Sequence, residues 1–477
     1  MAVISSPVYD PPTYADKLAK AYVAGSMAIN DARISKAADT SSALDALGSA
    51  LSSFQAALAA MNDGTKSVSA NSATFSTSAG TAVATATANS DAVAGTYAFY
   101  VEQLATAGQV SYNVADSAAS GAGSMNVTLA DGNNFQVNLT NADSNGDGTL
   151  TAKEIATAIN VAAGNNSRVK ASTLMINGQA KMVLTSVKTG AGNAVASIDV
   201  SALGSPALQA NLSAQTTMTT AKDAIVWVGG QGGTKVQQAS NEFTVVDNVK
   251  FTITAAQAPA AAPVTLTVGA DNSATATNVQ AFVTAYNNLM ALIDKVSAAG
   301  DHTVVEPTTP DGAPKPASGD APFHNDAGLK SLRDRIASTL RSATGGVSLI
   351  SFGISSDKKG VLTVDSGRLN KALSTYPGKL DTLFGRAGVG VDSGVLGTMN
   401  KLVKAWTSGS SGFIAARRTQ NDRLASDAKD RDDAIKAQYN NAYKRYLGQF
   451  TQLQSVQAAM TNTSNMFTAM FSSDSNN

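Results

Sequence analysis

Apolar side chains recur at alternating spacings of three and four residues near both ends of this 477-residue chain. One such series runs from Leu44 to Met61, and another runs from Ile435 to Met470. This heptad spacing is typical of helices that pack along one seam. Between about residues 67 and 267 the chain has short runs of Val, Thr, Phe and Tyr, separated by turn residues, which is typical of β-strands. The order predicts a β-rich head inserted into a helical rod.

We therefore predict an α+β multidomain fold, in which both termini form a helical rod or coiled-coil stem and the inserted head has two parts. The predicted division is a partly disordered N-terminal leg over 1–40, a helical stem of 41–64 with 275–435, an inner β head domain of 66–115 with 222–272, an outer head domain over 116–221, and a C-terminal leg helix over 436–477.

Apolar side chains at helical spacing predict the surfaces through which the helices of the rod pack. Thr40 and Ser41 are expected to cap the first strong helix and Gly64 to end it, while Tyr14, Leu18, Ala21 and Ala28 predict a weaker helical face upstream. A third helix is expected along the seam from Val279 to Val296, and a fourth around Leu329, Leu332, Ile336 and Leu340. These surfaces leave open whether the partner is the same chain or a neighbouring one. The predicted leg and oligomer seam consists of Leu44, Leu47, Leu51, Phe54, Leu58, Phe282, Tyr286, Leu289, Ile293, Ile435, Tyr439, Tyr446, Phe450 and Leu453.

The middle region carries clear turn signals. Asp131-Gly132 and Asn177-Gly178 each predict a tight β-hairpin, because both dipeptides accept the positive φ of a two-residue turn. The run EIATAIN, residues 154–160, predicts one helix among the strands.

Composition excludes several classes of function. Lys+Arg 35 balances Asp+Glu 35, which argues against nucleic acid or an anionic membrane as the main partner. The chain has no cysteine, so disulfides, zinc–thiolate sites and cysteine nucleophiles are ruled out. Its two histidines, His302 and His324, lie in or beside a proline-rich stretch expected to be a flexible linker. We expect exposed loop histidines there and no enzymatic activity.

No apolar run is long enough to predict a membrane span, and the first residues lack the basic and apolar regions of a secretory signal peptide. The composition nevertheless resembles that of extracellular proteins. A different export route is therefore expected.

One short segment, DSNGDGTLTAKE over residues 143–154, matches the twelve-residue calcium loop of EF-hands. Gly148 occupies the sixth position, where the turn needs positive φ, and Leu150 occupies the apolar eighth position. The predicted calcium ligands are Asp143, Asn145, Asp147, Thr149, Thr151 and Glu154.

The surroundings of this segment match only half of the motif. A predicted helix follows the loop, but a strand precedes it and no second loop exists to pair with it. The alternative is an ordinary polar turn between strand and helix. A bound calcium ion would be structural, and no cofactor is required.

Six segments, in order, resemble the flagellar filament-cap family, also called hook-associated protein 2 (FliD). They are SALSSFQAALAAM, DAVAGTYAFYVEQLATAG, EIATAIN followed by VKAS, SNEFTVVDNVKFTI, NVQAFVTAYNNLMALI and FGISSDKKGVLTVDSGRLNKAL. Within them the matching residues include Gly95, Tyr97, Val101, Leu104, Ala105, Ile159, Asn160, Ala171, Ser240, Asn241, Phe243, Phe282, Val283, Tyr286, Asn287, Gly353, Ile354, Gly360, Leu362 and Asp365. The resemblance spans nearly the whole chain.

This resemblance implies a structural protein that caps the growing flagellar filament and promotes flagellin folding and insertion. It implies a homo-oligomeric ring, commonly of five subunits, and contacts with flagellin, with hook–filament junction proteins and with a cytoplasmic export chaperone that binds the C-terminal leg. It also implies export through the flagellar type III apparatus to the extracellular tip of the bacterial flagellum.

Two other functions remain open from the sequence. A calcium-stabilised surface adhesin is compatible with the β head and the acidic loop, although the expected anchor or signal peptide is not seen. A hook–filament junction protein is the alternative within the flagellum, and the TYAFYVEQLA and AFVTAYNNL segments argue against it.

Overall fold

The computed structural model describes residues 10–63, 66–305, 315–316, 318–342, 344–388 and 390–473. It divides into two compact units. The first unit contains the described residues up to 63 and those from 276 onward. The second unit contains the described residues from 66 to 275. The helical ends and the β-rich middle confirm the predicted α+β multidomain class.

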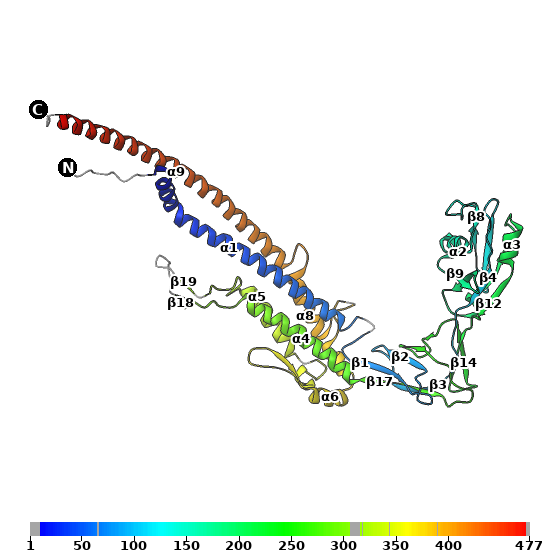
Figure 1. Cartoon of the computed structure of the whole chain (residues 1–477). Coiled ribbons are helices and arrows are strands. Elements are labelled where there is room, and N and C mark those ends of the chain that lie inside the picture. The colour runs from blue at the N-terminus through cyan, green and yellow to red at the C-terminus, as the bar shows by residue number, and fades with distance from the viewer. Residues whose placement is uncertain are drawn as a thin grey trace. The chain divides into compact units, whose positions relative to one another are not determined.

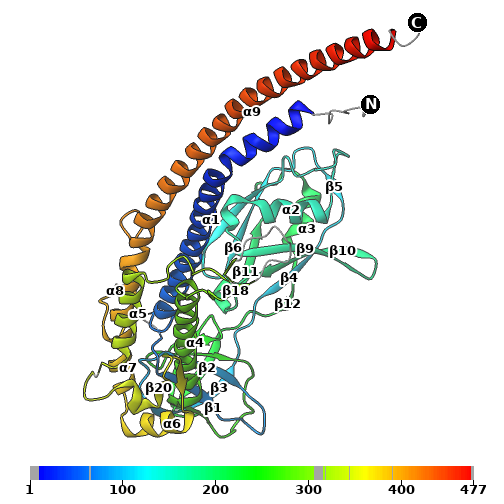
Figure 2. The same cartoon turned by 90° about the vertical axis from the view of Figure 1, so that its left-hand side faces the viewer.

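The first unit is mainly helical. Its longest helices are α1 (Pro11–Ala60) and α9 (Phe413–Ser473), which lie side by side in both views, with α9 continuing past the start of α1 (Figure 1, Figure 2). The remaining elements of this unit are α4 (Asn272–Val296, which begins within the second unit), β18 (Val304–Val305), β19 (Lys315–Pro316), α5 (Ala327–Leu340), the 3₁₀ turn Leu349–Phe352, β20 (Ile354–Ser356), β21 (Leu362–Val364), α6 (Ser366–Thr375), α7 (Lys379–Phe384) and α8 (Gly394–Thr407).

Helix α1 corrects the predicted start of the first strong helix. It begins at Pro11, and the Asp10 side chain caps it by accepting a hydrogen bond from the Thr13 backbone N–H. Thr40 lies inside the helix, where its hydroxyl donates to the Lys36 carbonyl at 2.7 Å. The prediction of a cap at Thr40 or Ser41 was wrong because α9 covers the alanine-rich segment and keeps it helical. The helix ends at Ala60, and the predicted stop at Gly64 lies outside the described residues.

The predicted face of the N-terminal segment was also wrong. Tyr14 and Leu18 are exposed, and the buried residues of this segment are smaller: Ala15, Ala19, Val23, Asn30 and Ala37. Small side chains allow two helix backbones to approach closely, so the larger ones lie beside the seam and stay partly exposed. The predicted disorder of the leg concerns in part residues 1–9, which lie outside the described residues.

The second unit contains antiparallel sheets around two hydrophobic cores. The strands of the first core are β1 (Ala70–Phe75), β2 (Ala84–Ala88), β3 (Gly95–Gln103), β13 (Ala224–Val228), β14 (Thr234–Gln238), β15 (Glu242–Phe243), β16 (Val249–Ile253) and β17 (Val264–Asp271). They form a five-stranded sheet, β1-β17-β3-β13-β14, and a three-stranded sheet, β15-β16-β2. Phe99 of the first sheet and Phe251 of the second meet with ring centroids 5.1 Å apart, so this core lies between the two sheets.

The second core is built from the remaining strands and two helices. These are β4 (Gln109–Asn113), β5 (Ser117–Ala118), β6 (Ser124–Leu129), β7 (Asn134–Asn138), β8 (Thr149–Leu150), α2 (Ala152–Val161), β9 (Val169–Ile176), β10 (Gln179–Ser186), β11 (Val195–Asp199), α3 (Pro206–Ser213) and β12 (Gln215–Thr219), with 3₁₀ turns at Ala163–Asn165 and Ala191–Asn193. The sheets are β12-β4-β10-β9 and β11-β6-β7. Strand β4 packs here through Val110 and Tyr112, although the predicted division assigns it to the inner domain.

Both predicted hairpins are present. Ile176 pairs with Gln179 across Asn177-Gly178, and both turn residues have positive φ. Strands β6 and β7 are joined through Asp131-Gly132, and the predicted helix is α2. Among the described residues, no helix is both long and apolar enough to cross a membrane.

Leu51 tests the packing of α1, because it is fully buried while Ser53, two residues away, is exposed. Leu51→Asp places an unpaired carboxylate in this core and is expected to lower the free energy of unfolding by at least about 3 kcal/mol. Ser53→Asp is expected to change it by less than about 0.5 kcal/mol. Urea unfolding of the full chain, followed by far-ultraviolet circular dichroism, measures both changes. Equal midpoints for the two variants would contradict the buried placement of Leu51.

Candidate functional site

Helices α1 and α9 run antiparallel in one heptad register. The buried residues on α1 include Val23, Asn30, Ala37, Leu44, Leu51 and Leu58, each seven residues after the one before. Those on α9 follow the same period: Ile414, Asn421, Ala428, Ile435 and Ala442. A period of seven keeps one face of each helix turned toward its partner along the whole pair.

Two buried asparagines hold this register. The Asn30 side-chain amide donates to the Ala428 carbonyl at 3.0 Å, and the Asn421 amide donates to the Ala37 carbonyl at 2.9 Å. Each helix thus provides one asparagine and, seven residues further on, one accepting carbonyl. A shift of the helices by one residue would break both bonds and leave two buried amides without acceptors, which costs about 1–3 kcal/mol each. We call this pair of bonds the asparagine clasp.

Most of the predicted seam residues pack inside the chain. Leu44, Leu47, Leu51, Phe54, Leu58, Phe282, Tyr286, Leu289, Ile293 and Ile435 are buried in the single chain, so they already have partners there. Tyr439 donates its hydroxyl to Asp16 at 2.6 Å, and Phe450 packs on Tyr14 with ring centroids 5.8 Å apart. Tyr446 is half-buried, and the Arg445 guanidinium lies over its ring.

The end of α9 presents a different surface. Leu453, Val456, Met460 and Phe467 are exposed, as is Met470. The helix carries no charged residue from Tyr446 to its last residue, Ser473. Here α9 has already passed the start of α1 (Figure 2). An uncharged helix with exposed large apolar side chains is suited to packing against another helix.

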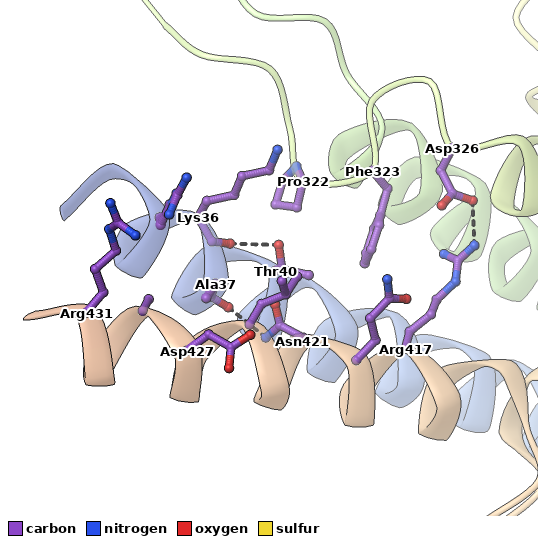
Figure 3. A pocket seen from close by; sticks show the side chains of 14 residues that line it. Lys36, Ala37, Thr40, Pro322, Phe323, Asp326, Arg417, Asn421, Asp427 and Arg431 are labelled. Carbon is purple, nitrogen blue, oxygen red and sulfur yellow. Dashed lines mark hydrogen bonds and ion pairs between the residues drawn. The ribbon is translucent and has the colours of Figure 1, made fainter. Parts of the chain in front are cut away.

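A cavity of about 790 Å³ lies beside the asparagine clasp, between α1, α9 and the segment before α5 (Figure 3). The Arg417 guanidinium forms its inner end, bonded to Asp326 at 2.7 Å and stacked between the rings of Phe323 and Trp406. Among the described residues, Nη1 of Arg417 is one of two buried side-chain polar atoms without a hydrogen-bond partner, and Oδ1 of Asn30 is the other. Neither Arg417 nor Asn30 was among the predicted site residues. The places of Asn30 and Asn421 in the heptad repeat are the signal that marks them as polar seam residues.

The acidic loop has the backbone turns that its sequence predicts. Gly146 and Gly148 have positive φ, and their N–H groups donate to the two carboxylate oxygens of Asp143 at 2.7 and 2.9 Å. Leu150 is fully buried and pairs with Ser117 in the short ladder of β5 and β8. That ladder takes the place of a second loop, with which an EF-hand loop would normally pair.

The carboxylate of Glu154 is already bonded within the protein. One oxygen accepts from the backbone and side chain of Ser144 at 3.0 and 3.1 Å, and the other accepts from the backbone and side chain of Thr151 at 3.0 and 2.9 Å. Thr151 and Glu154 form the capping box of α2. In the described part of the chain, no three His, Cys, Asp or Glu side chains are grouped to hold a metal. Calcium binding at the six predicted ligands therefore stays a prediction.

Local hydrogen bonds determine the acidity of this loop. The Thr151 backbone N–H holds the pKa of Glu154 below its usual range, and the Thr149 hydroxyl does the same for the pKa of Asp147. A lowered pKa in the folded state means that these contacts add stability above the usual carboxylate pKa, and that this stability is lost as the pH falls through the folded-state value.

The two histidines lie in the segment between α4 and α5. His302 is bonded to Asp320 at 3.1 Å and is largely exposed, and His324 is half-buried with its ring 3.4 Å from the Ser297 carbonyl. Most of the predicted proline-rich linker, residues 306–314, lies outside the described residues.

Two family models match this chain. Residues 9–108 match the model described as flagellar hook-associated protein 2 N-terminus, and residues 221–462 match the model described as flagellar hook-associated protein 2 C-terminus. The acidic loop lies between the two matched regions.

Similar proteins come from several bacteria. The lateral flagellar hook-associated protein 2 of Vibrio parahaemolyticus is 29% identical over 390 residues, which are 80% of this chain and 83% of that protein. The B-type flagellar hook-associated protein 2 of Pseudomonas aeruginosa is 29% identical over 448 residues, 88% of each chain. The crystal structure of the D1-D2-D3 domains of the flagellar cap protein FliD from Escherichia coli covers 80% of this chain and 99% of its own, with 23% identity and a TM-score of 0.57, and shows a shared fold.

The acidic loop makes one testable prediction. A lone loop of this kind is expected to bind calcium with a dissociation constant on the order of 10⁻³ M. At about 10 mM calcium the folded second unit would then gain about 1.4 kcal/mol and unfold a few degrees higher. Calorimetry of the full chain with calcium and with chelator measures this shift.

Glu154→Gln should abolish the shift, because glutamine retains the capping box but loses the bidentate charge. Asp131→Asn is the matched control, since Asp131 lies in a hairpin turn outside the loop and bonds to Asn133. A wild-type chain with no shift would identify the loop as an ordinary turn.

Proposed function

Because this chain belongs to the flagellar hook-associated protein 2 family, we propose that it caps the growing end of a flagellar filament and promotes the folding and insertion of flagellin. The observation that carries the proposal is the match of the two family models to both ends of the chain, which include α1, α4 and α9. The alternatives of an adhesin and a junction protein receive no support from these matches.

The terminal helix pair supports a structural role. A cap must hold the filament end and yet move on as subunits are added, so its contacts have to be separable. Helix α1 is buried by leucines between Leu44 and Leu58, where it lies against the start of α9 and against α8, but by alanines and the asparagine clasp where it pairs with α9 nearer the N-terminus. Each buried CH₂ contributes about 0.8 kcal/mol, so the alanine part is held less firmly than the leucine part. The part that would hold the filament is thus the part that opens more easily.

The exposed end of α9 supports contacts with other helical proteins. Its side chains from Leu453 to Met470 are uncharged and include several exposed large apolar ones, so a partner helix can cover them without burying a charge. We propose flagellin, the hook–filament junction proteins and a cytoplasmic export chaperone as its partners at different stages. A homo-oligomeric ring, commonly of five subunits, and export through the flagellar type III apparatus to the extracellular filament tip belong to the same proposal. The role is structural, without a catalytic step.

Complementation tests this function. The full chain is expected to restore filaments and swimming in a flagellated strain that lacks its own cap protein. A variant ending at residue 450 is expected to restore neither and to release unpolymerised flagellin into the medium, because it lacks the uncharged end of α9. Removing only residues 474–477 is the matched control and should leave function intact.

The amount of each variant in the medium separates assembly from export, since a chaperone that binds the removed segment would also affect secretion. A full chain that is exported but leaves filaments unformed would contradict the proposed function.

A further inference from the structure

One edge of the α1–α9 pair carries basic side chains that lack partners. Arg33 and Lys36 on α1 and Arg431 on α9 line the cavity beside the clasp, together with one exposed carboxylate, Asp427 of α9, so this edge carries a net positive charge. Among the described residues none of these four side chains forms an ion pair. Leu424, on α9, lines the same cavity and is 57% exposed. Figure 3 shows Lys36 and Arg431 reaching from the two helices to the same side. We call Arg33, Lys36, Leu424 and Arg431 the basic edge.

The opposite edge of the same pair is acidic. Asp45 and Arg418, which bond to each other, line a second cavity there together with Gly48 and Ala415. Residues seven or fourteen positions apart on either helix lie on the same edge of the pair, because both helices follow the heptad repeat. Asp31 and Ile34 lie 14 residues before Asp45 and Gly48, and Asp422 lies seven residues after Ala415. We call Asp31, Ile34 and Asp422 the acidic edge.

The acidic edge also lacks internal partners. Asp31 and Asp422 are exposed, and neither forms an ion pair within the described residues. The lysines of this side do not neutralise them, because Lys429 is bonded to Asp433 and Lys436 to Asp432. Each edge therefore keeps a charge that the chain itself leaves unmatched.

The clasp fixes the heights of these side chains along the pair. Residue 30 lies opposite residue 428 and residue 37 lies opposite residue 421, so Lys36 is level with residue 422 and Ile34 is level with residue 424. Lys36 on the basic edge is thus at the height of Asp422 on the acidic edge, and Leu424 is at the height of Ile34. Asp427 of the basic edge is at the height of Asp31, and Arg33 lies two residues, about 3 Å along the axis, from that height.

We propose that the basic edge of one copy binds the acidic edge of the next, in a ring whose axis runs along the helix pair. Rotation about such an axis keeps neighbouring copies at equal height, so Lys36 meets Asp422 and Leu424 meets Ile34. Two different surfaces of the same chain are what a closed head-to-tail ring requires. This inference rests on the proposed function, because it identifies a surface through which the cap subunits associate.

The contact between the two edges is weak, because its ion pairs are exposed to solvent. Exposed ion pairs contribute about 0.2–1 kcal/mol each and are screened by salt. The Leu424–Ile34 contact adds apolar burial that is independent of salt. This edge contact therefore guides neighbouring rods into register, and its strength should fall as the ionic strength rises.

A charge exchange tests the ionic part of the contact. Lys36→Asp and Asp422→Lys should each weaken self-association of the full chain about fivefold to tenfold at low salt, and the double variant should restore it to within about twofold. Arg423→Asp is the control, since Arg423 is exposed on α9 but belongs to neither edge. Sedimentation velocity measures all four.

Cysteine cross-linking tests the geometry, because the chain has no cysteine of its own. Ile34→Cys with Leu424→Cys should give a ladder of covalent oligomers on oxidation. Within one chain these positions lie on opposite edges of the pair, so their side chains point apart and cannot form a disulfide. Ile34→Cys with Gln438→Cys is the matched control, since residue 438 lies two heptads beyond Leu424 and about 21 Å along the axis. It should give no ladder.

Equal ladders from both pairs, no ladder from the first, a wild-type chain that stays monomeric, or a double charge variant that fails to recover would each overturn the edge contact. If the full chain still restores filaments in the cap-deleted strain, such a result leaves the proposed function standing. Failure of that complementation would instead count against the function.

Discussion

The antiparallel pairing of α1 with α9 is the interaction on which the helical unit depends. The two bonds of the asparagine clasp join residues 398 and 384 positions apart in the chain, so the pairing closes a loop that includes the whole β-rich unit. Closing so long a loop costs conformational entropy, although the cost grows only slowly with length. An alanine-rich helix would be marginal alone in water, and the burial of its small face against α9 is what keeps α1 continuous.

The pair is not uniform along its length, and this has consequences for function. Leucines fill the seam near the end of α1, where the helix also contacts α8, while alanine and asparagine fill it nearer the start. The polar seam residues specify register at some cost in stability, as single asparagines do in coiled coils. A register held this strictly also fixes the height of every exposed side chain, so the two charged edges are defined by the buried clasp.

The turns and the acidic loop of the β-rich unit are held by interactions between residues close together in the sequence. Both predicted hairpins turn at Asx-Gly pairs, with positive φ at Asn177 and Gly178 in one and at Gly132 in the other, and aromatic side chains from two sheets fill one core. In the acidic loop, backbone N–H groups and nearby hydroxyls already bond to the carboxylates of Asp143, Asp147 and Glu154. Calcium would therefore replace existing bonds instead of organising a loose segment. The lowered pKa values of Asp147 and Glu154 have the same origin, because these bonds favour the ionised form.

The sequence alone determined the fold class, the seams of the long helices, the two hairpin turns and the helix after the acidic loop, because heptad spacing and Asx-Gly turns are local properties of the chain. It also carried the six segments that resemble the filament-cap family. Only the tertiary structure decided that the seam from Leu44 to Leu58 is covered by the same chain, that the helix begins at Pro11, capped by Asp10, instead of at Thr40, and that Tyr14 and Leu18 stay partly exposed. These features depend on which distant helix lies alongside, and a partner some 400 residues away leaves no local signal. The matching heights of Lys36 and Asp422 have the same basis, since they follow from the register that Asn30 and Asn421 establish across the pair.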